Sequence, residues 1–69
     1  MKTIEIRPIG KRARYKTVEN VVQICETDNN NLAIYYEKEG DIYKLDISLK
    51  LVEYVAVKQN GYVERFYHA

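Results

Sequence analysis

Residues 43–49 read YKLDISL, and this stretch decides the class of the fold. Its apolar residues alternate with polar or charged ones, and they are Tyr43, Leu45, Ile47 and Leu49. Successive side chains of a β-strand point to opposite faces of the sheet, so alternation places the apolar ones on one face. The stretch therefore predicts a β-strand with one buried face and one polar face.

The same pattern appears on the N-terminal side of this stretch. Residues 32–36 alternate after the polar tract 27–31, and Glu39-Gly40-Asp41 forms a tight connection between the two runs. Asn and Asp tolerate turn conformations, so the tract 27–31 is expected to be a turn. Residues 2–7 also alternate until Pro8, which cannot donate a backbone hydrogen bond. Two further strands follow from these patterns.

On the C-terminal side, residues 52–58 are rich in β-branched residues and carry apolar side chains on both faces. Such a pattern is typical of a strand inside a sheet or at an interface. Asn60-Gly61 then supplies the two positive φ angles that a type I′ hairpin turn requires. Residues 62–68 are the returning strand of this hairpin.

Residues 17–26 fit two structures. Val18, Val22 and Ile24 suit a strand, whereas Val18, Val21, Val22 and Cys25 also match the spacing of a helix, with Thr17 as its N-cap. The three valines and the isoleucine favour a strand, because β-branched residues prefer extended backbone. A short helix over 17–26 is the alternative.

We therefore expect residues 1–69 to form a single all-β domain, a five- or six-stranded antiparallel meander. A sheet of short strands must either curl into a small barrel or bury one face against a second copy. A chain of 69 residues buries only about 60% of its unfolded surface, so its stability is marginal without an additional constraint. The lone Cys25 allows no internal disulfide, and one His and one Cys give no metal-ligand spacing. We therefore expect a homo-oligomer without a metal or a cofactor.

No stretch approaches the ~20 apolar residues that cross a bilayer, and the N-terminus MKTIEIRPIG lacks the apolar block of a signal peptide. The expected location is the cytoplasm, with no membrane association.

The positive charge of the chain is concentrated near the N-terminus, where residues 11–16 read KRARYK. Residues 1–16 hold six cations against one acid, a net charge of +5, whereas the other 53 residues hold five cations and nine acids, a net charge of −4. A local field of this kind is where anionic ligands or acidic partner surfaces dock.

In an extended KRARYK segment, Arg12, Arg14 and Lys16 would project on one side at intervals of about 6.5 to 7 Å. Such cations could follow successive phosphates, and a tyrosine between them could stack on a base. Further candidate ligand-binding residues come from the first strand and from the last strand. The predicted ligand-binding residues are Arg7, Lys11, Arg12, Arg14, Tyr15, Lys16, Arg65 and Tyr67.

Each of these features also has a simpler interpretation. A basic run can be a solvated connection that keeps a sheet edge from pairing with other chains. The seven tyrosines can fill and border a small β core, since aromatic residues favour strands. No His, Cys or close carboxylate pair has a spacing that supports acid–base or nucleophilic catalysis. An enzyme is therefore not expected.

The sequence predicts a non-enzymatic binding protein that holds an anionic ligand, either a nucleotide-type small molecule or nucleic-acid phosphates. The alternative is a protein–protein interaction module that inhibits or docks on an acidic partner surface. The short, β-rich and tyrosine-rich chain resembles small accessory proteins of phages, including those that sequester nucleotide signals or block host defence enzymes. This resemblance assigns no functional residues.

Overall fold

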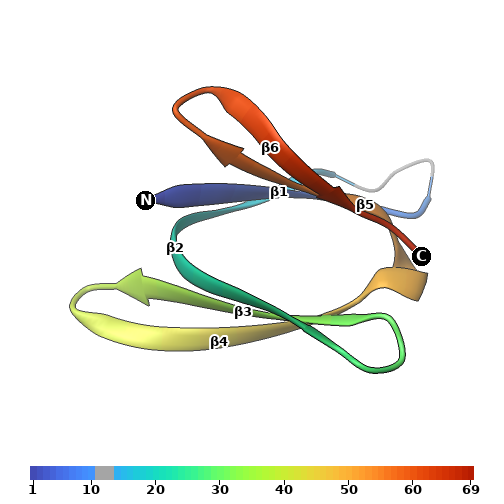
Figure 1. The fold of residues 1–69 in the computed structure, drawn as a ribbon, viewed down its shortest axis with the longest axis horizontal. Helices are drawn as coiled ribbons and strands as arrows, with labels where there is room; N and C mark the ends of the chain where they lie inside the picture. The colour runs from blue at the N-terminus through green and yellow to red at the C-terminus, as the bar shows by residue number, and fades with distance from the viewer. Residues whose placement is uncertain (11–13) are drawn as a thin grey trace.

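The computed structural model describes residues 1–10 and 14–69, and six antiparallel strands form a single sheet (Figure 1). The prediction of an all-β chain is thus confirmed. The elements in chain order are β1 (Lys2–Pro8), β2 (Lys16–Thr27), β3 (Asn31–Lys38), β4 (Asp41–Ser48), the one-turn 3-10 helix η1 (Leu49–Leu51), β5 (Val52–Gln59) and β6 (Tyr62–Tyr67).

Residues 17–26 form a strand, so the helical alternative for this segment is wrong. They belong to β2, which pairs with β1 through its first residues and with β3 from Val21 onward. Backbone pairing with two different strands, together with the β-branched side chains, outweighs the helical spacing of the same residues.

The strand order in the sheet is β4-β3-β2-β1-β5-β6. The strands from β1 to β4 form the predicted meander, and β5 then returns to pair with β1 instead of β4. β5 accordingly lies in the interior of the sheet, as its apolar residues on both faces predict. The sheet is open, because β4 and β6 remain its two edges, so of the two predicted alternatives the small barrel is not adopted. A barrel requires its edge strands to pair with each other, which these two do not.

The sheet folds over at a bend in β2. Asn20 lies at this bend with a positive φ of 57°, and the pairing of β2 with β3 shifts its register between Val21 and Gln23. Extra residues in one strand increase its local twist and bend it. In Figure 1, β2 curves from the layer that contains β1, β5 and β6 into the layer of β3 and β4.

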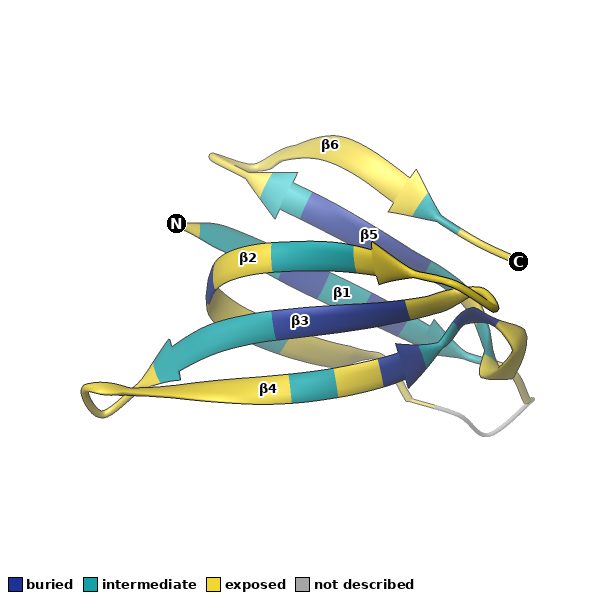
Figure 2. Ribbon diagram, turned by 60° about the horizontal axis from the view of Figure 1, so that its bottom comes forward, coloured by how far each residue is buried: buried dark blue, intermediate teal, exposed yellow. Residues whose placement is uncertain are grey.

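The hydrophobic core lies between these two layers (Figure 2). Its side chains come from all the strands except β6, and from η1. The buried members are Ile4, Ile6, Val21, Leu32, Ile34, Ile47, Leu49, Val55 and Val57. We call the sheet face that carries these side chains the inner face, and the opposite face the outer face.

The alternating residues 43–49 span two elements, β4 and η1. β4 ends at Ser48, and Leu49 is the first residue of the 3-10 turn, where it is still buried. The Leu49 amide donates a hydrogen bond of 2.8 Å to the Asn30 carbonyl in the turn between β2 and β3. This bond holds the chain against the end of the core as it crosses to β5.

Candidate functional site

The predicted ligand-binding residues fall into two groups on opposite faces of the sheet. Arg7 and Tyr15 contact each other on the outer face, whereas Arg65 and Tyr67 contact each other on the inner face. Arg14 and Lys16 are exposed, and Lys16 pairs with Ile6, which places it on the inner face. The two remaining predicted residues, Lys11 and Arg12, lie outside the described residues.

Strand register explains why the outer face of β1, β5 and β6 gathers aromatic side chains. Arg7 of β1 pairs with Tyr54 of β5, and Ala56 of β5 pairs with Phe66 of β6. Tyr54 and Ala56 are two residues apart and therefore share a face, opposite to the buried Val55. Arg7, Tyr54 and Phe66 consequently lie side by side across three neighbouring strands.

Tyr15 extends this arrangement, and we call Tyr15, Tyr54 and Phe66 the outer aromatic row. The ring centroids of Tyr15 and Tyr54 are 6.4 Å apart, and those of Tyr54 and Phe66 are 5.6 Å apart in an edge-to-face geometry. These distances are in the range of favourable aromatic pairs. The two terminal members are largely exposed, Tyr15 at 50% and Phe66 at 56%. Large apolar area is thus open to solvent at both ends of the row.

Two polar contacts organise one end of the outer aromatic row. The guanidinium carbon of Arg7 lies 4.5 Å from the centroid of the Tyr15 ring, and Arg7 Nε is also 3.5 Å from a carboxylate oxygen of Glu53. The Tyr54 hydroxyl donates a hydrogen bond of 3.2 Å to the Tyr15 hydroxyl. This hydrogen bond, with a smaller contribution from desolvation, raises the pKa of Tyr54 to about 12. The folded protein therefore holds the Tyr54 proton more tightly than an unperturbed tyrosine does.

The positive excess beside the outer aromatic row comes from Arg14, because Lys16 pairs with Ile6 and lies on the inner face. Lys58 is neutralised by Glu5 at 2.8 Å, and Arg7 is close to Glu53. Neither Arg14 nor Lys16 forms an ion pair with any acid in the described part of the chain. Cations without a carboxylate partner are free to bind an external anion.

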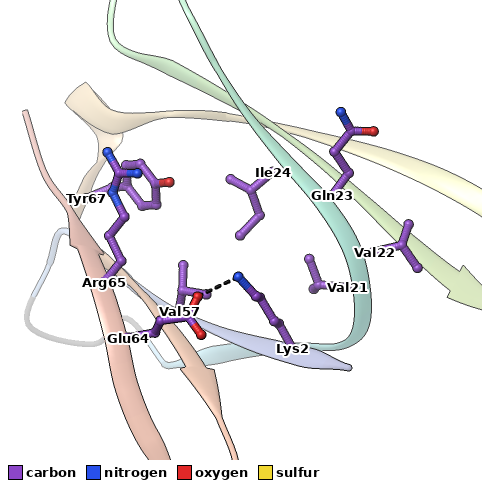
Figure 3. A pocket seen from close by; sticks show the side chains of 9 residues that line it. All are labelled: Lys2, Val21, Val22, Gln23, Ile24, Val57, Glu64, Arg65 and Tyr67. Carbon is purple, nitrogen blue, oxygen red and sulfur yellow. Dashed lines mark hydrogen bonds and ion pairs between the residues drawn. The ribbon is translucent and has the colours of Figure 1, made fainter.

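The inner face carries a separate cavity of about 240 Å³ between β2 and β6 (Figure 3). Apolar side chains of Val21, Ile24 and Val57 form its floor, and polar side chains surround its rim. The full lining is Lys2, Val21, Val22, Gln23, Ile24, Val57, Glu64, Arg65 and Tyr67.

The cations at this inner cavity already have carboxylate partners. Lys2 forms an ion pair with Glu64, drawn as a dashed line in Figure 3, and Arg65 Nη2 lies 2.7 Å from Glu26 Oε1. The Arg65 guanidinium also lies 4.6 Å from the centroid of the Tyr67 ring. Because the positive charges are balanced locally, the inner cavity has less attraction for an anion than the outer face.

Two members of the outer aromatic row, Tyr54 and Phe66, are not among the predicted site residues. Their position depends on the pairing of β1 with β5 and of β5 with β6, which joins residues far apart in the chain. One sequence feature points to apolar side chains on the outer face of β5. Residues 52–58 carry apolar side chains on both faces of the strand.

Within residues 1–10 and 14–69, no cluster of three His, Cys, Asp or Glu side chains has the geometry to hold a metal ion. The same residues contain no helix with the length and apolar character needed to cross a membrane.

Comparison of the chain with protein-family models, with curated proteins and with solved structures gave no match.

Proposed function

We propose that this protein binds single-stranded nucleic acid on its outer face, without catalysing a reaction. The observation that carries the proposal is the outer aromatic row, with Tyr15 and Phe66 exposed at its two ends and Arg7 placed over the Tyr15 ring. Proteins that bind single strands combine aromatic rings, on which bases stack, with a positively charged path for the backbone.

The arrangement supplies both parts of such a surface. Each exposed ring offers a face to a base, and stacking contributes about 1–3 kcal/mol per base. Arg14 is adjacent to Tyr15, is exposed and has no carboxylate partner among the described residues, so it is available to contact a phosphate next to a base on that ring. Specific recognition of bases by stacking requires them to be unstacked and accessible, as they are in single strands and not in a duplex.

A small nucleotide and a single strand would use the outer aromatic row differently. A nucleotide-type small molecule would stack on one ring and use one group of cations. A single strand would use Tyr15 and Phe66 together, which lie at opposite ends of the row. The exposure of both terminal rings favours the single strand. A cytoplasmic location is part of this proposal.

The experiment is a binding titration followed by fluorescence anisotropy, with a labelled single-stranded oligonucleotide, the corresponding duplex and a labelled mononucleotide as probes. We expect the single strand to bind most tightly. Replacing Tyr15 and Phe66 together by Ala should weaken binding by at least tenfold, because two stacking contacts are lost.

The matched control is Tyr62→Ala, which removes an aromatic side chain that is 78% exposed but lies in the β5–β6 hairpin, outside the row. It should leave the affinity unchanged. Equal affinity of the double variant and the wild type for the single strand would exclude the outer aromatic row as the binding surface. Tight binding of the mononucleotide alone would identify the ligand as a small nucleotide.

A second candidate function is an interaction module for an acidic protein surface. Arg14 and Lys16 favour it, since exposed cations attract carboxylates as well as phosphates. The exposed apolar side chains on the two edge strands, such as Ile42 on β4 and Val63 on β6, also favour self-association into a homo-oligomer. Mass spectrometry under native conditions would give both the copy number and the mass of any retained partner.

A further inference from the structure

The inner cavity lies between two strand edges that have no neighbour in the sheet. β6 pairs with β5 through one edge only, and residues 22–27 of β2 pair only with β3. The other edge of each strand carries backbone N–H and C=O groups without a partner in the sheet. An edge of this kind is a template for another strand.

The space between these edges continues beyond the inner cavity. A second cavity of about 230 Å³ adjoins it along β6, and Arg65 and Tyr67 line both. The lining of the second cavity is Glu26, Thr27, Asn30, Asn31, Leu49, Arg65, Phe66, Tyr67 and His68. We call the two cavities together the inner slot. It runs along β6 from Glu64 to Tyr67 and on to His68, which follows the strand.

Side chains, and not backbone hydrogen bonds, bridge the inner slot. Paired strands lie about 4.8 Å apart, whereas β2 and β6 are not paired and meet through the tips of two long side chains, Arg65 and Glu26. Both side chains are more than half exposed, at 60% and 55%. An exposed ion pair is weak and can be exchanged for other partners. The bridge therefore does not prevent a ligand from entering.

The two edges also have compatible directions. In Figure 2 the arrowheads of β2 and β6 point the same way. One extended segment that runs in the opposite direction would be antiparallel to both strands, and it could satisfy both rows of backbone groups. Such a segment would close the opening that the sheet leaves between β6 and β2.

We propose that the inner slot binds an extended peptide segment by β-strand addition, with apolar side chains at alternate positions. The alternation follows from the floor of the slot, where the side chains of Val21, Ile24 and Val57 would face every second residue of the peptide. Backbone hydrogen bonds would supply affinity, and these pockets would supply specificity.

The geometry also restricts what kind of chain the occupant is. A strand between two edges needs both of its own edges free, and each of the six strands in residues 1–10 and 14–69 is already paired on at least one side. A strand within the sheet of a folded second copy therefore does not fit. The occupant is a segment outside any sheet, such as a tail or an unfolded stretch of another protein. Phe66 borders the second cavity as well as ending the outer aromatic row, but the floor of the inner slot is on the opposite face of the sheet, so this proposal does not depend on nucleic-acid binding.

The test begins with a library of short random peptides selected on the wild-type protein. Selected sequences are then made as free peptides, and their affinities are measured by calorimetry. We expect sequences with apolar residues at alternate positions. A copy of the best peptide with alternate backbone nitrogens methylated should lose binding at least tenfold, since methylation removes the donors of a β-ladder.

Two protein variants locate the site. Ile24→Trp places a large ring in the inner slot, because the Ile24 side chain points into the cavity, and should weaken peptide binding at least tenfold. Ile42→Trp is the matched control, because Ile42 is 57% exposed on β4 and lines neither cavity of the inner slot. It should leave peptide affinity unchanged. Circular dichroism confirms that both variants are folded.

Three results would overturn the proposal. They are the absence of any peptide enriched over a protein-free surface, equal affinity of the methylated and unmethylated peptides, and equal affinity of a folded Ile24→Trp variant and the wild type. The comparison of methylated and unmethylated peptides uses only the wild-type protein, so it remains decisive if Ile24→Trp does not fold.

Discussion

The guanidinium of Arg7 lies 4.5 Å from the centroid of the Tyr15 ring, although Arg7 belongs to β1 and Tyr15 to the segment that leads into β2. A cation over an exposed ring contributes about 0.5–1 kcal/mol. The contact joins the start of β2 to the outer face and keeps a positive charge beside the ring on which we propose that a base stacks. Arg7 therefore has two roles. It holds the Tyr15 ring in place, and it supplies a positive charge for a phosphate of the bound strand.

Replacing Arg7 by Gln should weaken the binding of a single-stranded oligonucleotide and reduce its dependence on salt. Each phosphate contact on a single strand contributes about 0.7 to the slope of log affinity against log salt, so the slope should become shallower by about that amount. Anisotropy titrations at several salt concentrations measure it. Arg65→Gln, on the inner face, is the control and should leave the slope as in the wild type. A slope changed equally by both variants would contradict the assignment of the outer face.

The raised pKa of Tyr54 predicts a loss of stability at alkaline pH. The pKa is about 12 in the folded protein against an ordinary value of 10.0, so the folded state holds this proton more tightly than the unfolded state. The contribution to stability is therefore complete below about pH 10 and is lost as the pH rises toward 12. Urea unfolding at several alkaline pH values measures this loss.

Two variants assign this pH dependence to one hydrogen bond. Tyr54→Phe removes the titrating group, and Tyr15→Phe removes the hydroxyl that accepts the Tyr54 proton. Both should lose less stability than the wild type between pH 10 and 12. A parallel decline in all three proteins would mean that the hydrogen bond does not govern the titration.

The individual strands could be predicted from the sequence because each one follows from local alternation. Residues 43–49 and the Asn60-Gly61 turn contain in a few residues all the information that a strand or a hairpin needs. Leu49 shows the limit of this reasoning. It continues the alternation but lies in the 3-10 turn, since alternation identifies a buried side chain and does not by itself fix where the strand ends.

The candidate site could be predicted only in part, because it depends on pairing between distant strands. Arg7 and Tyr15 were identifiable from the concentration of charge near the N-terminus. Tyr54 joins them only because β5 returns to pair with β1, a long-range contact that no local pattern specifies. Arg65 and Tyr67 lie on the other face for a similar reason. Their pairing with Val57 and Val55 of β5 places them with the core side chains.

The bend in β2 should depend on the residue at position 20. Asn20 has a positive φ of 57°, a conformation that costs most residues about 1–2 kcal/mol and Asn or Gly less. Asn20→Val should therefore destabilise the protein by about that amount, whereas Asn20→Gly should change its stability little. Denaturant unfolding gives both values. Thr17→Val, an exposed substitution in the same strand before the bend, controls for the change to valine.

Two isoleucines in neighbouring strands differ in burial, so replacing each by Ala should change the stability by different amounts. Ile34 of β3 is 0% exposed and belongs to the core, so Ile34→Ala should cost about 2–5 kcal/mol, including the cavity that it leaves. Ile42 of β4 is 57% exposed, so Ile42→Ala should change stability by about 0.5 kcal/mol or less. Since a small domain has little stability in reserve, Ile34→Ala should leave a substantial unfolded fraction, and Ile34→Val should have a smaller effect of about 0.5–1.5 kcal/mol. Chemical denaturation of the three variants measures these differences. Similar losses for Ile34→Ala and Ile42→Ala would contradict the position of the core between the two layers, on which the division into an outer aromatic row and an inner slot depends.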